Sequence, residues 1–168
     1  ITTNGALLTP ELVEELIDYG LDSVKVTLDG NRVCHDRLRP FANGQGSFDL
    51  ILDHVSYAAT RIRVAVGGNF DTSNVDSFAE LLDVLEQRGL RETLEKVSFK
   101  PISETPEDRR KIPQHRELSC VYAREETARD SVRLRNMLIE RGFPTDPGIG
   151  VTICGATMSD VHFTIDPN

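Results

Sequence analysis

The sequence predicts an α/β fold in which parallel strands are joined by crossover helices. Three observations predict it. Short β-branched runs alternate with amphipathic segments, the ends of successive runs lie about 25 to 40 residues apart, as in β/α units, and polar or turn-forming residues gather at those ends. The strand ends are Asn4, Asp29, Asn69 and Pro101. Because the carboxyl ends of parallel strands share one edge, we expect a site along that edge.

The first half of the chain is expected to hold two helices and two strands. Residues 10–19 predict a helix that Thr9 caps and Gly20 ends, and residues 23–28 predict a strand that enters a loop at Asp29-Gly30. A second helix is predicted from an apolar stripe of Phe48, Ile51, Leu52 and Val55. Residues 62–66 predict the next strand, which ends in Gly67-Gly68-Asn69.

The second half continues the alternation and then loses it. Asn74 is expected to cap a helix whose buried face is Phe78, Leu81, Leu82 and Leu85. Residues 96–99 predict a strand that Pro101 stops, and residues 102–122 predict a long, charged loop. A long helix follows from about Glu125 to Arg141, and residues 161–165 alternate as a last strand.

Composition limits the classes of function. The length of 168 residues fits one domain, and 39% hydrophobic with 27% charged residues is typical of a folded globular protein. A net charge of -8 argues against nucleic acid as a partner. The absence of a long apolar run and of a leader predicts no membrane partner and a cytoplasmic location.

Three cysteines, Cys34, Cys120 and Cys154, lie far apart in the chain. Their odd number and wide spacing argue against a disulfide scaffold and against a self-contained cysteine metal site. The chain begins at Ile1 without a methionine and ends in Asp166-Pro167-Asn168. We therefore expect that both ends are cut from a longer protein.

Six short motifs follow one another along the chain. They are Ile-Thr-Thr-Asn-Gly at 1–5, Val-Lys-Val-Thr-Leu-Asp-Gly at 24–30, His35-Asp36-x-x-Arg39, Gly46-Ser47-Phe48, the strand ending in Asn69, and Val-Ser-Phe-Lys-Pro-Ile at 97–102. In order and spacing they closely resemble the middle of radical S-adenosylmethionine (SAM) enzymes with SPASM extensions. The resemblance covers nearly the whole chain.

The resemblance implies an incomplete (β/α) barrel. Residues 1–148 would hold the tip of strand three and strands four to six of a six-stranded partial barrel, and residues 149–168 the truncated start of a SPASM extension. The intact protein would be an iron–sulfur oxidoreductase that uses SAM and 4Fe-4S clusters to generate a 5′-deoxyadenosyl radical, for modification of a peptide or protein. The cluster-binding Cys-x3-Cys-x2-Cys loop would lie before Ile1, so we expect this chain alone to be inactive and to hold no cofactor.

The resemblance also implies which residues bind cofactors, while the catalytic residues stay unknown. Arg39 would bind the SAM carboxylate through its forked guanidinium, and the alternative is a surface arginine. Thr27 stands where the family usually has serine and keeps the hydroxyl, whereas Asn4 and Asn69 end strands at the same rim and equally suit turns. Cys154 would be the first ligand of an auxiliary cluster in the intact protein, and otherwise a free thiol.

The remaining polar motifs are expected to have structural roles. Asp29-Gly30 is predicted chiefly to shape a loop, with catalysis as the alternative. His35 and Asp36 are predicted to brace the loop that carries Arg39, with proton transfer as the alternative.

Two other functions remain open. The chain could be a non-radical β/α barrel enzyme or a binding module, although no phosphate-binding glycine motif supports this. It could also act only as an interaction scaffold, because missing strands would leave a barrel edge open to self-association.

Overall fold

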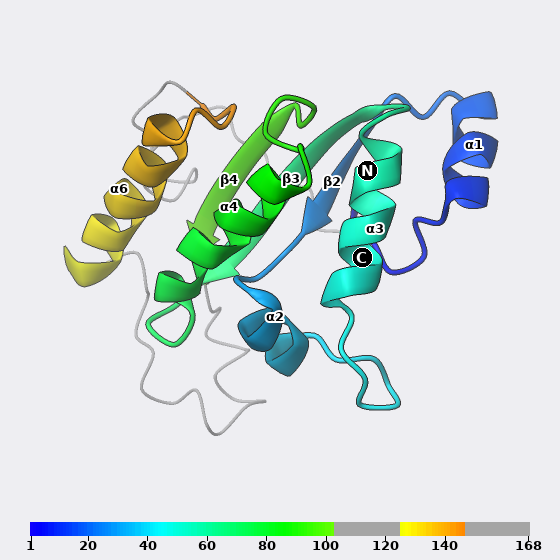
Figure 1. The fold of residues 1–168 in the computed structure, drawn as a ribbon. Helices are drawn as coiled ribbons and strands as arrows, with labels where there is room; N and C mark the ends of the chain where they lie inside the picture. Colours follow the sequence, from blue (N-terminus) through cyan, green and yellow to red (C-terminus); the bar gives the residue numbers. More distant parts are fainter. Residues whose placement is uncertain (103–124, 147–168) are drawn as a thin grey trace, which may run out of the picture.

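The computed structural model describes residues 1–102 and 125–146, and their core is a four-stranded parallel sheet (Figure 1). The strands lie in the order β1 (Thr2–Thr3), β2 (Ser23–Thr27), β3 (Arg63–Phe70) and β4 (Lys96–Pro101). Each strand pairs in parallel with the next along the chain. The predicted α/β class with crossover connections is confirmed.

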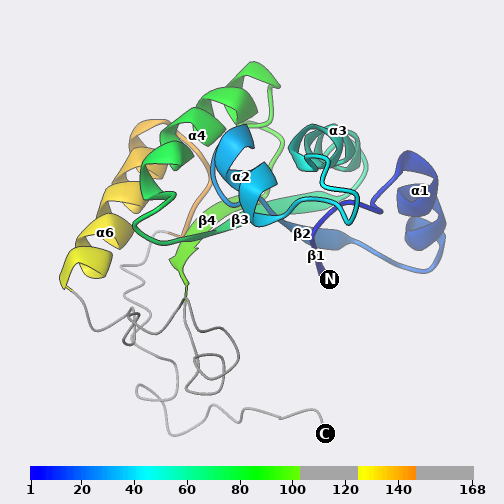
Figure 2. The same ribbon diagram turned by 90° about the horizontal axis from the view of Figure 1, so that it is seen from below.

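The helices of the described part follow the strands in sequence. They are α1 (Pro10–Asp18), α2 (Arg32–Leu38), α3 (Phe48–Ala58), the 3₁₀ turn η1 (Val75–Ser77), α4 (Phe78–Gln87) and α6 (Glu125–Glu140). Figure 2 shows α2, α3, α4 and α6 on one side of the sheet. The predicted strand over 161–165, most of the predicted loop and the expected extension from residue 149 lie outside the described residues.

The two faces of the sheet therefore differ in what covers them. Along β2, Val24 and Val26 are buried beneath the helices, while Lys25 and Thr27 alternate with them and point to the other face. Laterally, Thr27 pairs with Gly67, and Gly67 pairs with Ser98. We call the face that carries Lys25 and Thr27 the uncovered face, because no helix of the described part lies on it.

The hydrophobic core lies between the sheet and its helices. Its fully buried large side chains include Phe48, Ile51, Leu52, Phe70, Phe78, Leu81, Leu82, Leu85, Leu134 and Leu138. The predicted inner stripes of α3 and α4 are thus buried as expected. At the first helix, Thr9 Oγ1 accepts a hydrogen bond from the Leu12 amide at 3.3 Å, so the predicted cap is confirmed.

Three details of the predicted elements differ from the structure. Residues 32–38 form helix α2, where the sequence predicted a loop, because this helix is mostly polar and shows no apolar stripe. Strand β3 ends at Phe70, one residue past the predicted end at Asn69, and both glycines before that end are paired within the sheet. Asn74 does not cap a helix through its side chain, which bonds elsewhere as described below.

Within residues 1–102 and 125–146, no helix is both long enough and apolar enough to cross a membrane.

Candidate functional site

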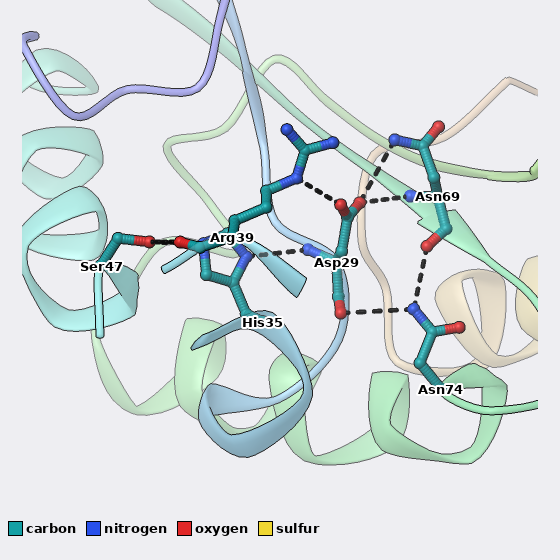
Figure 3. A network of polar contacts seen from close by, with 6 residues as sticks. All are labelled: Asp29, His35, Arg39, Ser47, Asn69 and Asn74. Carbon is teal, nitrogen blue, oxygen red and sulfur yellow. Dashed lines mark hydrogen bonds and ion pairs between the residues drawn. The ribbon is translucent and has the colours of Figure 1, made fainter. Parts of the chain in front are cut away.

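A buried carboxylate, Asp29, joins the carboxyl ends of β2 and β3 (Figure 3). Asp29 is only 4% exposed. One of its oxygens, Oδ2, accepts a hydrogen bond from Arg39 Nε at 2.5 Å. The other, Oδ1, accepts from the Asn69 amide at 2.7 Å and from Asn69 Nδ2 at 3.3 Å. Asp29 therefore ties two of the predicted site residues, Arg39 and Asn69, into one cluster.

Asn74 reinforces this junction from behind. Its side-chain Nδ2 donates to the backbone carbonyl of Asn69 at 3.0 Å and to that of Asp29 at 3.4 Å. Asn74 is buried, so these bonds satisfy a polar group that water cannot reach. The ends of β2 and β3 are therefore held together by both side-chain and backbone atoms.

Gly30 allows the chain to turn tightly at this junction. Its φ is +97°, and a Cβ atom there would lie 2.1 Å from Ser77 Oγ. Only glycine fits both the left-handed backbone and the close approach of η1. The predicted loop-shaping role of the Asp29-Gly30 pair thus has a physical basis.

His35 connects α2 to the site through a chain of hydrogen bonds. Its Nδ1 accepts from the Asp29 backbone amide at 3.1 Å, so the ring proton must sit on Nε2, which donates to Ser47 Oγ at 3.1 Å. Ser47 Oγ donates in turn to the Arg39 carbonyl at 2.7 Å. Burial is the main cause that lowers the pKa of His35, while Asp29 and Asp36 oppose it. The neutral imidazole fits these contacts.

Asp36 fixes the start of α3. Its Oδ1 accepts from the backbone amides of Ser47 and Phe48, both at 2.8 Å. These are amides at a helix start, which need acceptors from outside the helix. A Cβ atom at Gly46 would lie 2.3 Å from Asp36 Oδ2, which explains the glycine. His35 and Asp36 thus brace the segment that carries Arg39, and they face the protein interior and backbone.

The predicted site residues are placed unequally. The side chain of Arg39 is 40% exposed, and Figure 3 shows its two terminal nitrogens directed away from Asp29. Thr27 lies on the uncovered face at the end of β2, and its hydroxyl makes no hydrogen bond to another described residue. Asn4 bonds locally, because its Oδ1 accepts from the Ala6 amide at 3.0 Å. Contacts unite Arg39 and Asn69, but not Asn4 or Thr27, with this cluster.

The described residues offer no place for a metal cluster. Within residues 1–102 and 125–146, no three His, Cys, Asp or Glu side chains gather closely enough to hold a metal ion. Cys34 is a half-buried free thiol. Cys120 lies outside the described residues, and so does Cys154, the predicted ligand of an auxiliary cluster.

The sequence predicts chiefly a loop-shaping role for Asp29, whereas the structure places this residue at the centre of the cluster. The sequence does not predict the role of Asn74 in the cluster. An aspartate directly after a strand, with an arginine 10 positions further along, is a usable signal for an ion pair. The bond from Asn74 to Asp29 spans 45 positions, so no local pattern indicates it.

Comparisons with known proteins give one sequence match and several matches of fold. No family model matches the chain. It is 32% identical to Fe-coproporphyrin III synthase of Methanosarcina barkeri (strain Fusaro / DSM 804) over 88 residues. These 88 residues are 52% of this chain and 21% of that protein. The chain thus spans about a fifth of the length of this curated relative.

Solved structures of Streptococcus suis SuiB have a similar fold. SuiB bound to its precursor peptide SuiA matches with a TM-score of 0.60 and 14% identity, over 87% of this chain and 31% of SuiB. SuiB bound to S-adenosylmethionine matches with a TM-score of 0.57 and 15% identity, over 98% of this chain and 35% of SuiB. The sequence match and the shared fold together confirm the resemblance to radical SAM enzymes that the motifs indicate.

Proposed function

We propose that this chain forms the SAM-binding rim of a radical SAM enzyme, an iron–sulfur oxidoreductase that modifies a peptide or protein. The observation that carries the proposal is the arginine at the strand ends. Asp29 fixes Arg39 through Nε, and the two terminal nitrogens remain directed away from that carboxylate. Two parallel N–H donors of this kind match the geometry of a ligand carboxylate.

The neighbouring groups suit the rest of such a ligand. Thr27 offers a hydroxyl and Asn69 an amide on the same face of neighbouring strands, close to their carboxyl ends. Parallel α/β sheets bind ligands at this edge. SuiB, whose fold the chain shares, binds both S-adenosylmethionine and a precursor peptide. This supports the choice of cofactor and of substrate class.

The described residues fit SAM and do not fit an iron–sulfur cluster, since they hold no group of metal ligands. In the intact enzyme, the cluster and SAM would together supply the radical chemistry of hydrogen-atom abstraction. The contribution of this chain is to orient the SAM carboxylate with Arg39, and to hold the strand ends in place with Asp29 and Asn74. We propose that the cluster-binding units lie outside this chain, and that Cys154 is a ligand of an auxiliary cluster.

The test is the SAM affinity of the full-length enzyme after Arg39→Gln. Losing a charge-assisted pair of hydrogen bonds should weaken SAM binding about tenfold or more. Arg37→Gln is the matched control, because Arg37 is exposed near the end of helix α2, two positions before Arg39, and its loss should leave the affinity unchanged. Unchanged affinity after Arg39→Gln would remove the assigned role, and SAM binding without cleavage would favour a binding module.

A further inference from the structure

Lysine is concentrated on the uncovered face of the sheet. The chain has four lysines and a net charge of -8, and three of those lysines, Lys25, Lys96 and Lys100, lie on β2 and β4. On β4, Val97 is buried and Phe99 packs against Phe78, so Lys96, Ser98 and Lys100 point to the opposite face. We call Lys25, Lys96 and Lys100 the lysine face.

Lys25 leans across β3 toward β4. A Cβ atom added to Gly67 would lie 2.4 Å from Lys25 Cε and 3.1 Å from its Nζ, so the end of this side chain rests over the Gly67 backbone. Gly67 pairs laterally with Ser98, two positions before Lys100. β2 and β4 are two strand spacings apart, about 9 to 10 Å, and the glycine lets Lys25 cross part of that gap.

The ammonium groups of Lys96 and Lys100 are close enough to act on that of Lys25. Burial is the main cause that lowers the pKa of Lys25, and Lys100 and then Lys96 lower it further. Lys96 is paired with Asp146 at 2.5 Å. No described residue forms an ion pair or hydrogen bond with the ammonium of Lys25 or Lys100. Positive charges gathered in this way attract an anion, because a bound anion offsets the repulsion between them.

Several arginines of the described part differ from Lys25 and Lys100. Arg61, Arg63, Arg88 and Arg141, for example, pair with carboxylates at the surface. Within the described residues, the unpaired ammonium groups of the lysine face therefore differ from the positive charges of these arginines, which carboxylates neutralise. The lysine face is a local excess of positive charge beside the strand ends that carry Thr27 and Asn69.

We infer that the lysine face binds carboxylate side chains of an acidic peptide segment, which places an acidic stretch in the substrate of this enzyme. The inference rests on the proposed function, since the peptide substrate comes from there. Aspartate and glutamate are the anions that a peptide itself supplies. Lysine, a mobile point charge on a flexible stem, suits carboxylates that are not held in one fixed geometry.

The test is fluorescence anisotropy with the full chain and two labelled synthetic peptides. In one peptide glutamate alternates with glycine, and in the other glutamine replaces every glutamate. The acidic peptide should bind more tightly. Lys25→Gln and Lys100→Gln should each weaken its binding about threefold to fivefold, as expected for partly or fully exposed ion pairs, and the double variant about tenfold. Added salt should reduce the difference between the peptides.

Matched variants separate charge from fold. Lys25→Arg keeps the charge and should retain most of the affinity. Gly67→Ala keeps every charge but displaces the end of Lys25, so it should weaken binding. Arg88→Gln removes one positive charge on the helix side, where Arg88 pairs with Asp53, and should change nothing. Circular dichroism melting of each variant reports whether it is folded.

The outcomes distinguish this inference from the proposed function. Equal binding of both peptides, or an unchanged affinity in the double lysine variant, overturns the lysine face as a peptide site. If the full-length enzyme binds SAM and the peptide test fails in this way, the proposed function is kept. If the chain binds the acidic peptide through its lysines but the full-length enzyme never binds SAM, the lysine face is kept and the proposed function is lost.

Discussion

Gly67 and Gly68 are neighbours on β3, yet a methyl group added to each would meet a different environment. At Gly67 it would meet the flexible end of Lys25 on the uncovered face, and at Gly68 it would meet Phe78 and the backbone of Leu28 under the helices. One strand thus separates a packed apolar layer from a polar, basic one. The covered face stabilises the fold, while the uncovered face keeps room for mobile side chains.

The largest expected effect is on the covered face. Phe78 is fully buried, with its ring centroid 4.4 Å from that of Phe99 and 6.5 Å from that of Phe70. Phe78→Ala should lower the free energy of unfolding by about 3–5 kcal/mol, because it removes a large buried ring and leaves a cavity. Urea unfolding of the full chain measures this, and a loss below about 1 kcal/mol would contradict the packing described.

The next effect compares the two glycines directly. Gly68→Ala should destabilise the chain by about 1–3 kcal/mol, since the new methyl group would lie 2.5 Å from the Leu28 carbonyl oxygen and from Phe78. Gly67→Ala should leave the stability unchanged or raise it by up to about 1 kcal/mol, because alanine suits a strand better than glycine. Equal losses in the two variants, measured by urea unfolding, would show that the faces do not differ as described.

The smallest effect concerns a polar group within the covered side. His35 is buried and neutral, and burial lowers its pKa below the value of about 6.5 that it has when unfolded. The unfolded chain therefore takes up the proton first, so the contribution of His35 to stability is complete above that pH and is lost as the pH falls below it. Unfolding measured at several pH values should show the loss.

His35→Asn is the matched variant for this pH dependence, because asparagine can still accept a hydrogen bond from the Asp29 backbone amide and does not titrate. The difference in stability between the wild type and this variant should shrink as the pH falls below about 6.5. A difference that stays constant with pH would mean that His35 is not held neutral in the folded chain.

The sequence predicts most of the covered layer and only part of the rim. Apolar periodicity locates α3, α4 and α6, because burial on one face sets the spacing of their apolar residues. Helix α2 escapes this test, since Val33 and Leu38 are exposed and a histidine is its buried residue. The sequence places the end of β3 near Asn69, but it does not reveal that Gly67 and Gly68 make space on opposite faces of the strand.

The site follows the same division. Arg39 and Asn69 are predicted from motifs, and their link through Asp29 depends on two strand ends that are 40 positions apart. The lysine face could have been noticed from the sequence, because Lys25 lies between Val24 and Val26 and so must face away from the apolar layer. Its charge becomes meaningful only with the register that brings β2, β3 and β4 side by side.

The segment between Arg39 and Ser47 is closed at its base. The Ser47 hydroxyl bonds the Arg39 carbonyl, and within the segment Phe41 and Gln45 bond each other through the backbone. Lengthening such a closed loop changes its entropy only slowly. Extra residues inserted near Gly44 would extend outward from this base and leave the guanidinium where Asp29 holds it. Related proteins can therefore differ in this loop and still present the same arginine.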